Sequence, residues 1–381
     1  MRDGTISIKK LLGYGALLIN VIVGLWLILC FGASSISPLR FKFLQLFSLT
    51  TPLAIIANFI FIFIWLFTNT KWRALFPFLL LVLCNRIIAP VFGFNYLSKN
   101  NEVRQNNTLK LIQWNVHGMG YFDEQHNHNA NDIMDVINKE APDIICLPEY
   151  YTLKNDSLKP FTSRLLADNG FPNFVFCQDN PYEFVNFGIA VFSKYPIRNT
   201  KTYNIDNHIV LIHCDIALPS AKGEKIVSMF FTHLCSFLFT NDDKDLLLSF
   251  TKKINIDEKD VWRSKAFINK FNRDYCLRAN EAEVISAIIN QTPYPVLVCG
   301  DFNDLPASYA YTVLKGSLND AFIQKGFGFG RTYNRIFPTL RIDHIFYDPT
   351  ALHLLSYRTL KLQLSDHYPI IANFEIDTHR W

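Results

Sequence analysis

The chain has 381 residues and a formal net charge of +4, which is unevenly distributed. Nine of its 37 Lys and Arg residues but only one of its 33 acidic residues lie within the first 99 positions, so residues 101–381 hold 28 basic and 32 acidic residues. The basic excess belongs to the apolar front of the chain. The remainder lacks the basic surface that is typical of a tight, nonspecific DNA-binding domain.

Two stretches near the amino terminus are long and apolar enough to cross a bilayer. Residues 11–31 and 43–67 contain no charged side chain, and each exceeds the roughly 20 residues that span the hydrocarbon core. Lys9 and Lys10 before the first stretch would also fit a cleaved signal peptide, but the second long stretch argues against that interpretation. We predict a membrane region over residues 1–98.

A third apolar stretch, residues 74–94, determines the predicted topology. It contains Asn85 and Arg86, and an Arg at the centre of a span costs about 2.5 to 3.5 kcal/mol, which the neighbouring Leu and Ile residues offset. Lys9 and Lys10 favour a cytoplasmic amino terminus. Three spans, which we predict, would place the rest of the chain outside the cytoplasm, whereas two would leave it inside.

Residues 99–108 are polar and rich in Asn, which is typical of a linker, and residues 109–381 follow as one α/β layered domain. Helical patterns occur at residues 132–139, 158–168 and within 268–289. Residues 237–278 form a long insertion without a predicted role, and no Cys or His spacing indicates a zinc site. The apolar runs predict strands at residues 109–114, 143–147, 188–193, 210–217, 226–232, 296–299, 341–347 and 370–374.

Polar side chains with chemical capacity follow several of these strands. Asn115 and Glu149 each come directly after a predicted strand, and an amide oxygen with a carboxylate suits Mg²⁺ or Mn²⁺. Each of the two is equally readily a turn residue. His233 ends another predicted strand, where a single His is more often structural than functional.

The pentapeptide from Gly300 to Asp304 follows the apolar run 295–299. Asp301 and Asn303 would face one site if Phe302 packs into the core. The alternative is an Asx-turn followed by a helix that Asp304 caps.

Two acidic residues near the carboxyl terminus are each followed by a histidine. Asp343 interrupts an apolar strand, so it requires a buried partner, and His367 is the obvious imidazole. Asp366 precedes His367 directly. Strand alternation points His344 away from Asp343, which favours a structural role for it.

Taken in order, these motifs resemble the endonuclease/exonuclease/phosphatase family, which includes deoxyribonucleases, apurinic endonucleases, neutral sphingomyelinases and inositol polyphosphate phosphatases. The resemblance implies a four-layered α/β sandwich of two packed sheets, preceded here by an α-helical transmembrane region. It covers residues from about 109 to 374 and rests on Asn115, Glu149 and residues 186–197, 232–234, 300–304, 342–344 and 365–367.

The resemblance also implies a metal site. Asn115 and Glu149 match the family's metal-site residues, and Asp366 contributes from the opposite wall. The cofactor implied is Mg²⁺ or Mn²⁺.

Five further residues match the family's catalytic groups. Asp301 matches the acid that orients or deprotonates the attacking water or assists the leaving group, and Asn303 matches the amide that stabilises the oxyanion. Asp343 matches the partner that fixes the tautomer of His367. His233 matches a second histidine of the deoxyribonuclease and sphingomyelinase branches, which the apurinic endonucleases lack.

The resemblance therefore implies a membrane-anchored hydrolase that cleaves a phosphodiester or phosphomonoester by in-line attack of water. Its partners would be a lipid, small-molecule or nucleic-acid phosphoester and, through the helices, the lipid bilayer; no protein partner is inferred. An inactive membrane-bound scaffold with the same fold is the alternative. A transporter is disfavoured, because the predicted spans contain only Arg86 as a charge.

Overall fold

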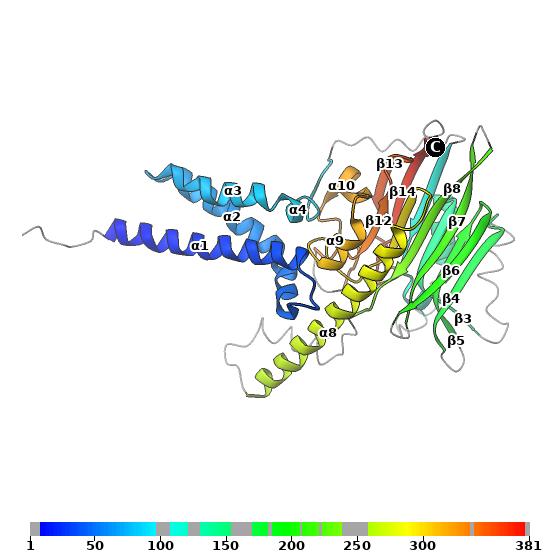
Figure 1. Cartoon of the computed structure of the whole chain (residues 1–381), viewed down its shortest axis with the longest axis horizontal. Coiled ribbons are helices and arrows are strands. Elements are labelled where there is room, and N and C mark those ends of the chain that lie inside the picture. Colours follow the sequence, from blue (N-terminus) through cyan, green and yellow to red (C-terminus); the bar gives the residue numbers. More distant parts are fainter. Residues whose placement is uncertain are drawn as a thin grey trace, which may run out of the picture.

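The computed structural model is elongated, with a bundle of apolar helices projecting from a sandwich of strands (Figure 1). The structure describes residues 8–96, 107–120, 130–153, 170–181, 185–205, 208–220, 223–237, 258–335 and 339–377. The helix predicted at residues 158–168 and much of the insertion at 237–278 lie outside the described residues.

The first sheet has six strands in the order β13-β14-β2-β3-β5-β4. All neighbours are antiparallel except β2 and β3, which are parallel. The strands are β2 (Thr108–Gln113), β3 (Ile144–Leu153), β4 (Asn173–Pro181), β5 (Val185–Ser193), β13 (Leu352–Thr359) and β14 (Ile370–Ile376).

The second sheet also has six strands, in the order β10-β12-β9-β8-β7-β6, with β8 and β9 parallel. All eight predicted strands occur in the two sheets. The strands of the second sheet are β6 (Ile197–Ile205), β7 (His208–Ser220), β8 (Gly223–His233), β9 (Val296–Asp301), β10 (Asn319–Asp320) and β12 (Asp343–Tyr347).

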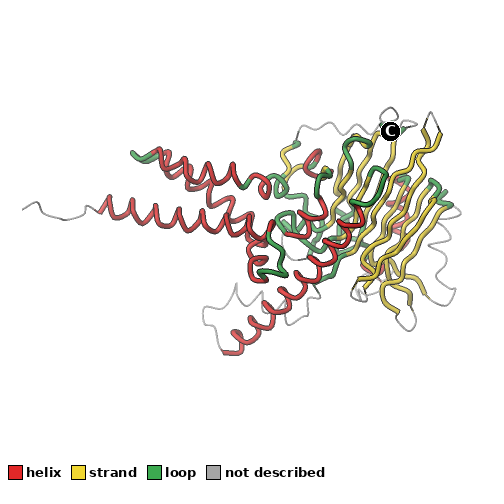
Figure 2. The backbone as a smooth tube through the Cα atoms, in the orientation of Figure 1, coloured by secondary structure: helices red, strands yellow, loops and turns green. Residues whose placement is uncertain are grey.

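The two sheets pack face to face, and helices cover both outer faces. Between the sheets, Leu111 and Cys146 of the first lie in one buried cluster with Met229 and Leu297 of the second. Helix α5 (Ala130–Glu140) covers the first sheet, and α8 (Glu258–Ile289) and α9 (Tyr309–Lys315) cover the second. The predicted four-layered α/β sandwich is therefore confirmed, and Figure 2 shows α8 rising obliquely beside the strands, with its lower end extending beyond them.

Amphipathic spacing explains how α5 attaches to its sheet. Its buried residues Ile133, Met134 and Ile137 lie on one face and belong to one buried cluster with Ile112 and Ile145 of the sheet. Burying each such side chain is worth about 1.5 to 3 kcal/mol.

The helical bundle contains two segments, Lys10–Ser35 and Lys42–Leu66, that are long and apolar enough to cross a membrane. They correspond to α1 (Ile8–Ser35) and to η1 (Lys42–Thr50) with α2 (Thr51–Leu66). By length and composition alone these helices are compatible with a membrane anchor.

The third predicted span, residues 74–94, contains several short helical segments, and the number of spans stays a prediction. It consists of η2 (Lys71–Ala74), α3 (Leu75–Leu83) and α4 (Asn85–Ile88), and it ends in β1 (Gly93–Phe94), which pairs with β11 (Phe327–Gly328). Cys84 leaves helical geometry with ψ near 12°, and Pro90 prevents continuation. In Figure 1, α3 lies beside α1 and α2 and leads back toward the sandwich.

The helical bundle docks directly on the sandwich. The Ser37 hydroxyl donates to Glu283 of α8 at 3.1 Å, and the buried Arg341 donates to the carbonyl of Pro90 at 2.9 Å. Ala307, in the loop after β9, is buried in the same apolar cluster as the helices.

Candidate active site

The polar residues singled out in the sequence converge at one edge of the sandwich. His233 and Asp301 are the last residues of the parallel strands β8 and β9, and Asn115 follows β2. Asp343 begins β12 and is directly opposite Asp301 in the antiparallel ladder, while His367 comes just before β14. The strand directions therefore bring both sheets' functional ends together.

Glu149 leaves the strand ladder where β3 changes register. The pairing of β3 with β5 shifts between Leu147 and Tyr150, and Glu149 has a positive φ of 54°. A bulge of this kind redirects a side chain out of the sheet. The Glu149 carboxylate consequently faces the groups on the neighbouring strand ends.

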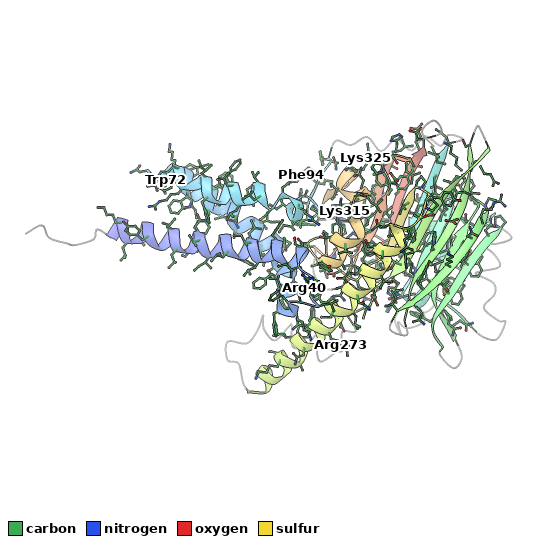
Figure 3. All side chains as sticks on the ribbon, in the orientation of Figure 1. Arg40, Trp72, Phe94, Arg273, Lys315 and Lys325 are labelled. Carbon is green, nitrogen blue, oxygen red and sulfur yellow. The ribbon has the colours of Figure 1, made fainter. Side chains whose placement is uncertain are left out.

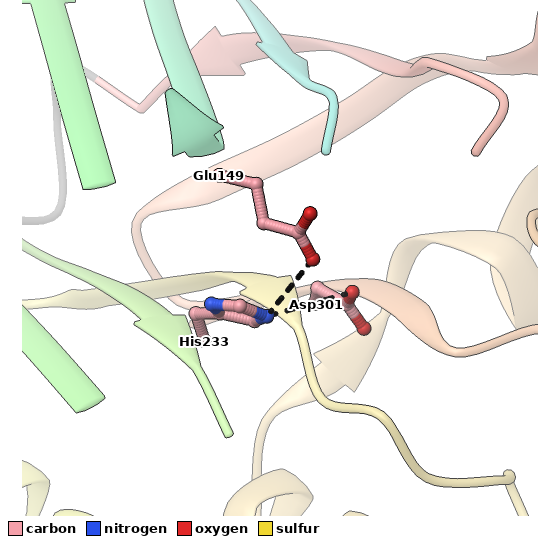
Figure 4. Close-up of side chains that lie close together, drawn as sticks. All are labelled: Glu149, His233 and Asp301. Atoms are coloured by element: carbon pink, nitrogen blue, oxygen red, sulfur yellow. Dashed lines mark ion pairs between the residues drawn. The ribbon is translucent and has the colours of Figure 1, made fainter. Parts of the chain in front are cut away.

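Asn115 connects the two sheets across the site. Its side-chain NH₂ group donates to Glu149 Oε1 and to Asp301 Oδ2, both at 2.9 Å, and its Oδ1 accepts from the backbone N–H of His117. Figure 4 shows the imidazole of His233 beside Glu149 and Asp301, with Nε2 at 3.6 Å and 4.0 Å from their carboxylate oxygens.

His117 is a member of the site that the sequence analysis missed. Its Nδ1 lies 3.2 Å from Glu149 Oε2 and 3.8 Å from Asp366 Oδ1, so it links these two predicted metal-site residues. The hydrogen bond with Glu149 raises the pKa of His117. Burial opposes ionisation of Glu149, but His117 and His233 outweigh it and lower the Glu149 pKa to about 2. The position of His117, two residues after Asn115 and just beyond the same strand, was the sequence feature that could have identified it.

Asp343 and His367 form a buried acid–imidazole pair. Asp343 Oδ2 lies 2.8 Å from His367 Nδ1, and the opposite oxygen accepts from Gln113 Nε2 at 3.0 Å. Trp114 fixes the His367 backbone through a bond from Nε1 to its carbonyl at 3.1 Å. Burial lowers the pKa of His367, but the charges of Asp343 and Asp301 reverse that and raise it. Gln113 was also missed, although it is a polar residue in an apolar strand.

Asp301 is fully buried at the centre of these contacts. Burial raises its pKa to about 6, against the opposing charge of His367, whose Nε2 lies 3.6 Å away. The backbone N–H of Asn303 donates to Asp301 Oδ1 at 2.8 Å, and Asn303 Nδ2 donates to the carbonyl of Leu234. The predicted packing of Phe302 into the core is present. The segment from Asp301 to Asn303 therefore forms an Asx-type turn, and the Asp301 carboxylate still faces the site.

A fully buried arginine joins the loops that follow β8 and β9. Arg278 of α8 donates to the carbonyl of Cys235 at 3.0 Å and to Asp304 at 3.4 Å, and its guanidinium lies 3.7 Å from the ring centroid of Phe237. Glu281, one turn further, accepts from the Cys235 N–H at 2.8 Å. This role could not be predicted from the sequence, because it depends on how α8 packs.

His344 points away from the site, as strand alternation predicted. Its Nδ1 lies 2.9 Å from Arg341, and its Nε2 lies 3.2 Å from the carbonyl of Asp304. Burial and the Arg341 charge lower the pKa of His344. It therefore supports the loop after β9 as a neutral side chain.

The site has the donors to hold a cation. Among the described residues, Glu149, His233 and Asp301 form one group whose ligand atoms lie within 4.8 Å of one another, and Asp301, Asp343 and His367 form another. Carboxylate-rich sites suit hard divalent cations, which offset the repulsion between buried acids. Of the three predicted metal-site residues, Glu149 belongs to such a group, Asn115 bonds to it, and Asp366 is connected to it through His117.

Comparison with known families gives two matches. Residues 112–367 match the Endonuclease/Exonuclease/phosphatase family. Residues 9–91 match a domain of unknown function. No curated protein sequence matches the chain.

Solved structures share the sandwich at low sequence identity. An endonuclease/exonuclease/phosphatase from Beutenbergia cavernae is 17% identical, with a TM-score of 0.51 over 71% of this chain and 72% of that one. The human Nocturnin catalytic domain with bound sulfate anion is 17% identical (TM-score 0.47; 71% and 94% covered), and truncated Caenorhabditis elegans TDP2 is 14% identical (0.46; 70% and 98%). The first of these supports the fold, and only the fold.

Proposed function

This chain belongs to the endonuclease/exonuclease/phosphatase family, and we propose that it is a membrane-anchored phosphoesterase that depends on Mg²⁺ or Mn²⁺. Members of the family are phosphoester hydrolases. The observation that carries the proposal is the buried array in which Asp343 holds His367, and His367 faces Asp301, which shares the Asn115 amide with Glu149.

In this proposal, Asn115, Glu149 and Asp366 hold the divalent ion, with Asp301 next to them. A bound divalent ion would offset the negative charge of the phosphate and polarise its P–O bond. The oxygen-rich donor set fits such an ion, and the lowered pKa of Glu149 keeps that carboxylate ionised at all physiological pH values.

The remaining groups act on protons and on charge at the phosphate. Asp343 fixes the Nδ1–H of His367, so Nε2–H points toward Asp301 and the substrate, where an imidazolium can donate to a phosphate oxygen. Asp301, with its pKa raised to about 6, can accept a proton from the attacking water. Asn303 and His233 supply further donors, and water attacks phosphorus in line with the leaving group.

We propose a phosphoester of a lipid or small molecule as the substrate class, ahead of nucleic acid. The support is the net charge of residues 101–381, where 32 acids exceed 28 basic residues, since nucleic acid binding depends on many cationic contacts.

We also propose that three helical segments cross the bilayer, which would place the sandwich on the side opposite the amino terminus. Figure 3 supports this, because Trp72 lies at the end of the bundle far from the sandwich, whereas Arg40 and Phe94 lie at the near end. With a cytoplasmic amino terminus, the sandwich would be extracytoplasmic.

The experiment that tests the proposed function is turnover of bis-p-nitrophenyl phosphate by the full-length protein in nanodiscs. We expect turnover with Mg²⁺ or Mn²⁺, none with chelator, and none in His367→Ala. Lys201→Ala on β6, at the edge of the second sheet away from β12, is the matched control. Folded protein that hydrolyses no phosphoester, including lipid and nucleotide substrates, would favour the inactive scaffold.

A further inference from the structure

A cluster of aromatic side chains is exposed at the junction between the helical bundle and the sandwich. This aromatic patch consists of Phe92, Phe94, Tyr96, Phe327 and Phe329, with neighbouring ring centroids 5.0 to 6.0 Å apart. Phe94, Tyr96 and Phe327 are 76%, 74% and 55% exposed. A contiguous exposed apolar surface of this kind marks an interaction site.

Backbone pairing fixes the patch on the sandwich. β1 and β11 are antiparallel, with Phe94 directly opposite Phe327, and Asn95 Nδ2 donates to the carbonyl of Ile323 at 2.8 Å. The patch therefore moves with the sandwich, and it is not a loose extension of the helices.

Cationic side chains from separate elements lie at the same junction. Figure 3 places Arg40, Lys315 and Lys325 there together with Phe94. Arg40 follows α1, Lys315 ends α9, and Lys325 ends α10 (Ala321–Lys325). Two acids lie near these cations, and both already have partners: Glu283 accepts hydrogen bonds from Ser37 and Tyr309, and Asp320 pairs with Arg341.

The far end of the bundle has a similar composition. Trp72 is 75% exposed and lies between Lys71 and Arg73. The 28 residues of α1 extend about 42 Å, which exceeds the roughly 30 Å of a hydrocarbon core. Aromatic and cationic side chains at both ends of apolar helices are the arrangement that fits two membrane–water interfaces.

We propose that the sandwich itself contacts the bilayer surface: the aromatic patch inserts at the boundary between head groups and acyl chains, while Arg40, Lys315 and Lys325 bind anionic head-group phosphates. This rests on the proposed anchoring of the helices. Aromatic rings are stable at the boundary between water and acyl chains, because they can bury apolar surface there. Each cation near an anionic lipid surface adds electrostatic attraction.

A short segment of chain connects the aromatic patch to the candidate active site. Six residues beyond Phe327 along the chain, Tyr333 forms a backbone bridge with His367, and their ring centroids are 5.0 Å apart. Six extended residues span at most about 22 Å. A membrane contact at Phe327 therefore holds the reaction centre close to phosphoesters at the bilayer surface.

Three positions for a trifluoromethyl-phenylalanine probe test this in the full-length protein in nanodiscs. Position 327 reports the patch, position 63 on α2, where Phe63 is 60% exposed, reports insertion of the bundle, and position 201 on β6 is the aqueous control. The fluorine signals are measured with a spin-labelled lipid and, separately, with a water-soluble gadolinium chelate.

We expect the spin-labelled lipid to remove most of the signal at positions 63 and 327 and to leave that at 201 intact. Anionic lipid should increase the effect at 327, and Arg40→Gln with Lys325→Gln should abolish that increase, while Lys201→Gln should not. If the signal at position 327 is reduced only by the gadolinium chelate, while that at position 63 is reduced by the spin-labelled lipid, the surface contact is refuted but the membrane anchor stands. Aqueous response at both would refute the anchor and the contact together, whereas the phosphoesterase assay would be unaffected.

Discussion

Asp343 Oδ2 lies 2.8 Å from Nδ1 of His367, in a pair with no exposure to solvent at the carboxylate. Gln113 holds the other Asp343 oxygen at 3.0 Å. A neutral amide in place of Asp343 keeps the volume but removes the charge that stabilises the imidazolium. The pair thus predicts a specific kinetic effect of Asp343→Asn.

We expect Asp343→Asn to lower kcat by about 10²- to 10⁴-fold, which is the usual contribution of a positioned acid–base group. The alkaline limb of the pH profile should move to lower pH, because Asp343 raises the pKa of His367. Steady-state kinetics over pH measures both effects. An unchanged alkaline limb, in a variant that folds and binds metal normally, would assign the pair a purely structural role.

Glu149→Gln should abolish stabilisation by Mn²⁺ or Mg²⁺. A ligand that binds only the folded state adds about 2.7 kcal/mol at 100 times its dissociation constant, so the wild type should show a metal-dependent rise in the unfolding midpoint. Glu224→Gln, on an exposed pair with Arg198, is the control that should retain the rise. Equal stabilisation of Glu149→Gln and wild type would place the ion elsewhere.

The Asp301 carboxyl predicts how the stability of the chelator-treated protein depends on pH. Its pKa is raised to about 6 on folding, from an ordinary value of about 3.9, so between these values the folded state binds more protons than the unfolded state. Stability from this group therefore decreases as pH rises through about 4 to 6.

Asp301→Asn removes that titration. The variant should become progressively more stable than wild type as pH rises through this window, and the gain should level off above it, although activity is lost. Denaturant unfolding in chelator at several pH values measures the difference. A difference that does not vary with pH would show that Asp301 is not destabilised by burial.

From the sequence, candidate site residues could be located where they stand at strand ends, but not where their position depends on packing. Asp301 was recognisable as an acid that follows an apolar run and Asp343 as an acid that interrupts one, and the structure places them opposite each other. His117 and Arg278 act through contacts with residues that the chain order does not bring near. Strand β6 was missed because its burial pattern is mostly exposed and does not alternate.

Arg278 predicts a positioning effect on catalysis. Arg278→Met removes the charge that faces the buried Asp304, and breaking a buried pair costs about 3 to 5 kcal/mol. Because Arg278 also holds the Cys235 carbonyl, kcat should fall more than KM rises. Arg198→Met removes an arginine whose pair with Glu224 is exposed on both sides, and it should leave stability almost unchanged.

The double variant Arg278→Met with Asp304→Asn separates charge from position. It should recover much of the stability, since no unpaired charge remains buried, but it should not recover kcat. Recovery of both would mean that Arg278 serves only to neutralise Asp304.

Gly300 predicts the largest steric effect of a single methyl group at the site. Its φ is 155°, and a Cβ there would lie 1.8 Å from the carbonyl oxygen of Thr232 on β8. Gly300→Ala must therefore separate the parallel strands that end in His233 and Asp301.

Gly170→Ala isolates the backbone cost, because Gly170 has φ of 70° with no atom within 4 Å of the added methyl, and that cost is about 1 to 2 kcal/mol. We expect thermal unfolding to show a clearly larger loss of stability for Gly300→Ala than for Gly170→Ala, and we expect Gly300→Ala to bind Mn²⁺ more weakly. Equal losses would mean that β8 and β9 tolerate separation, and the close approach of the two strands would then be irrelevant to the site.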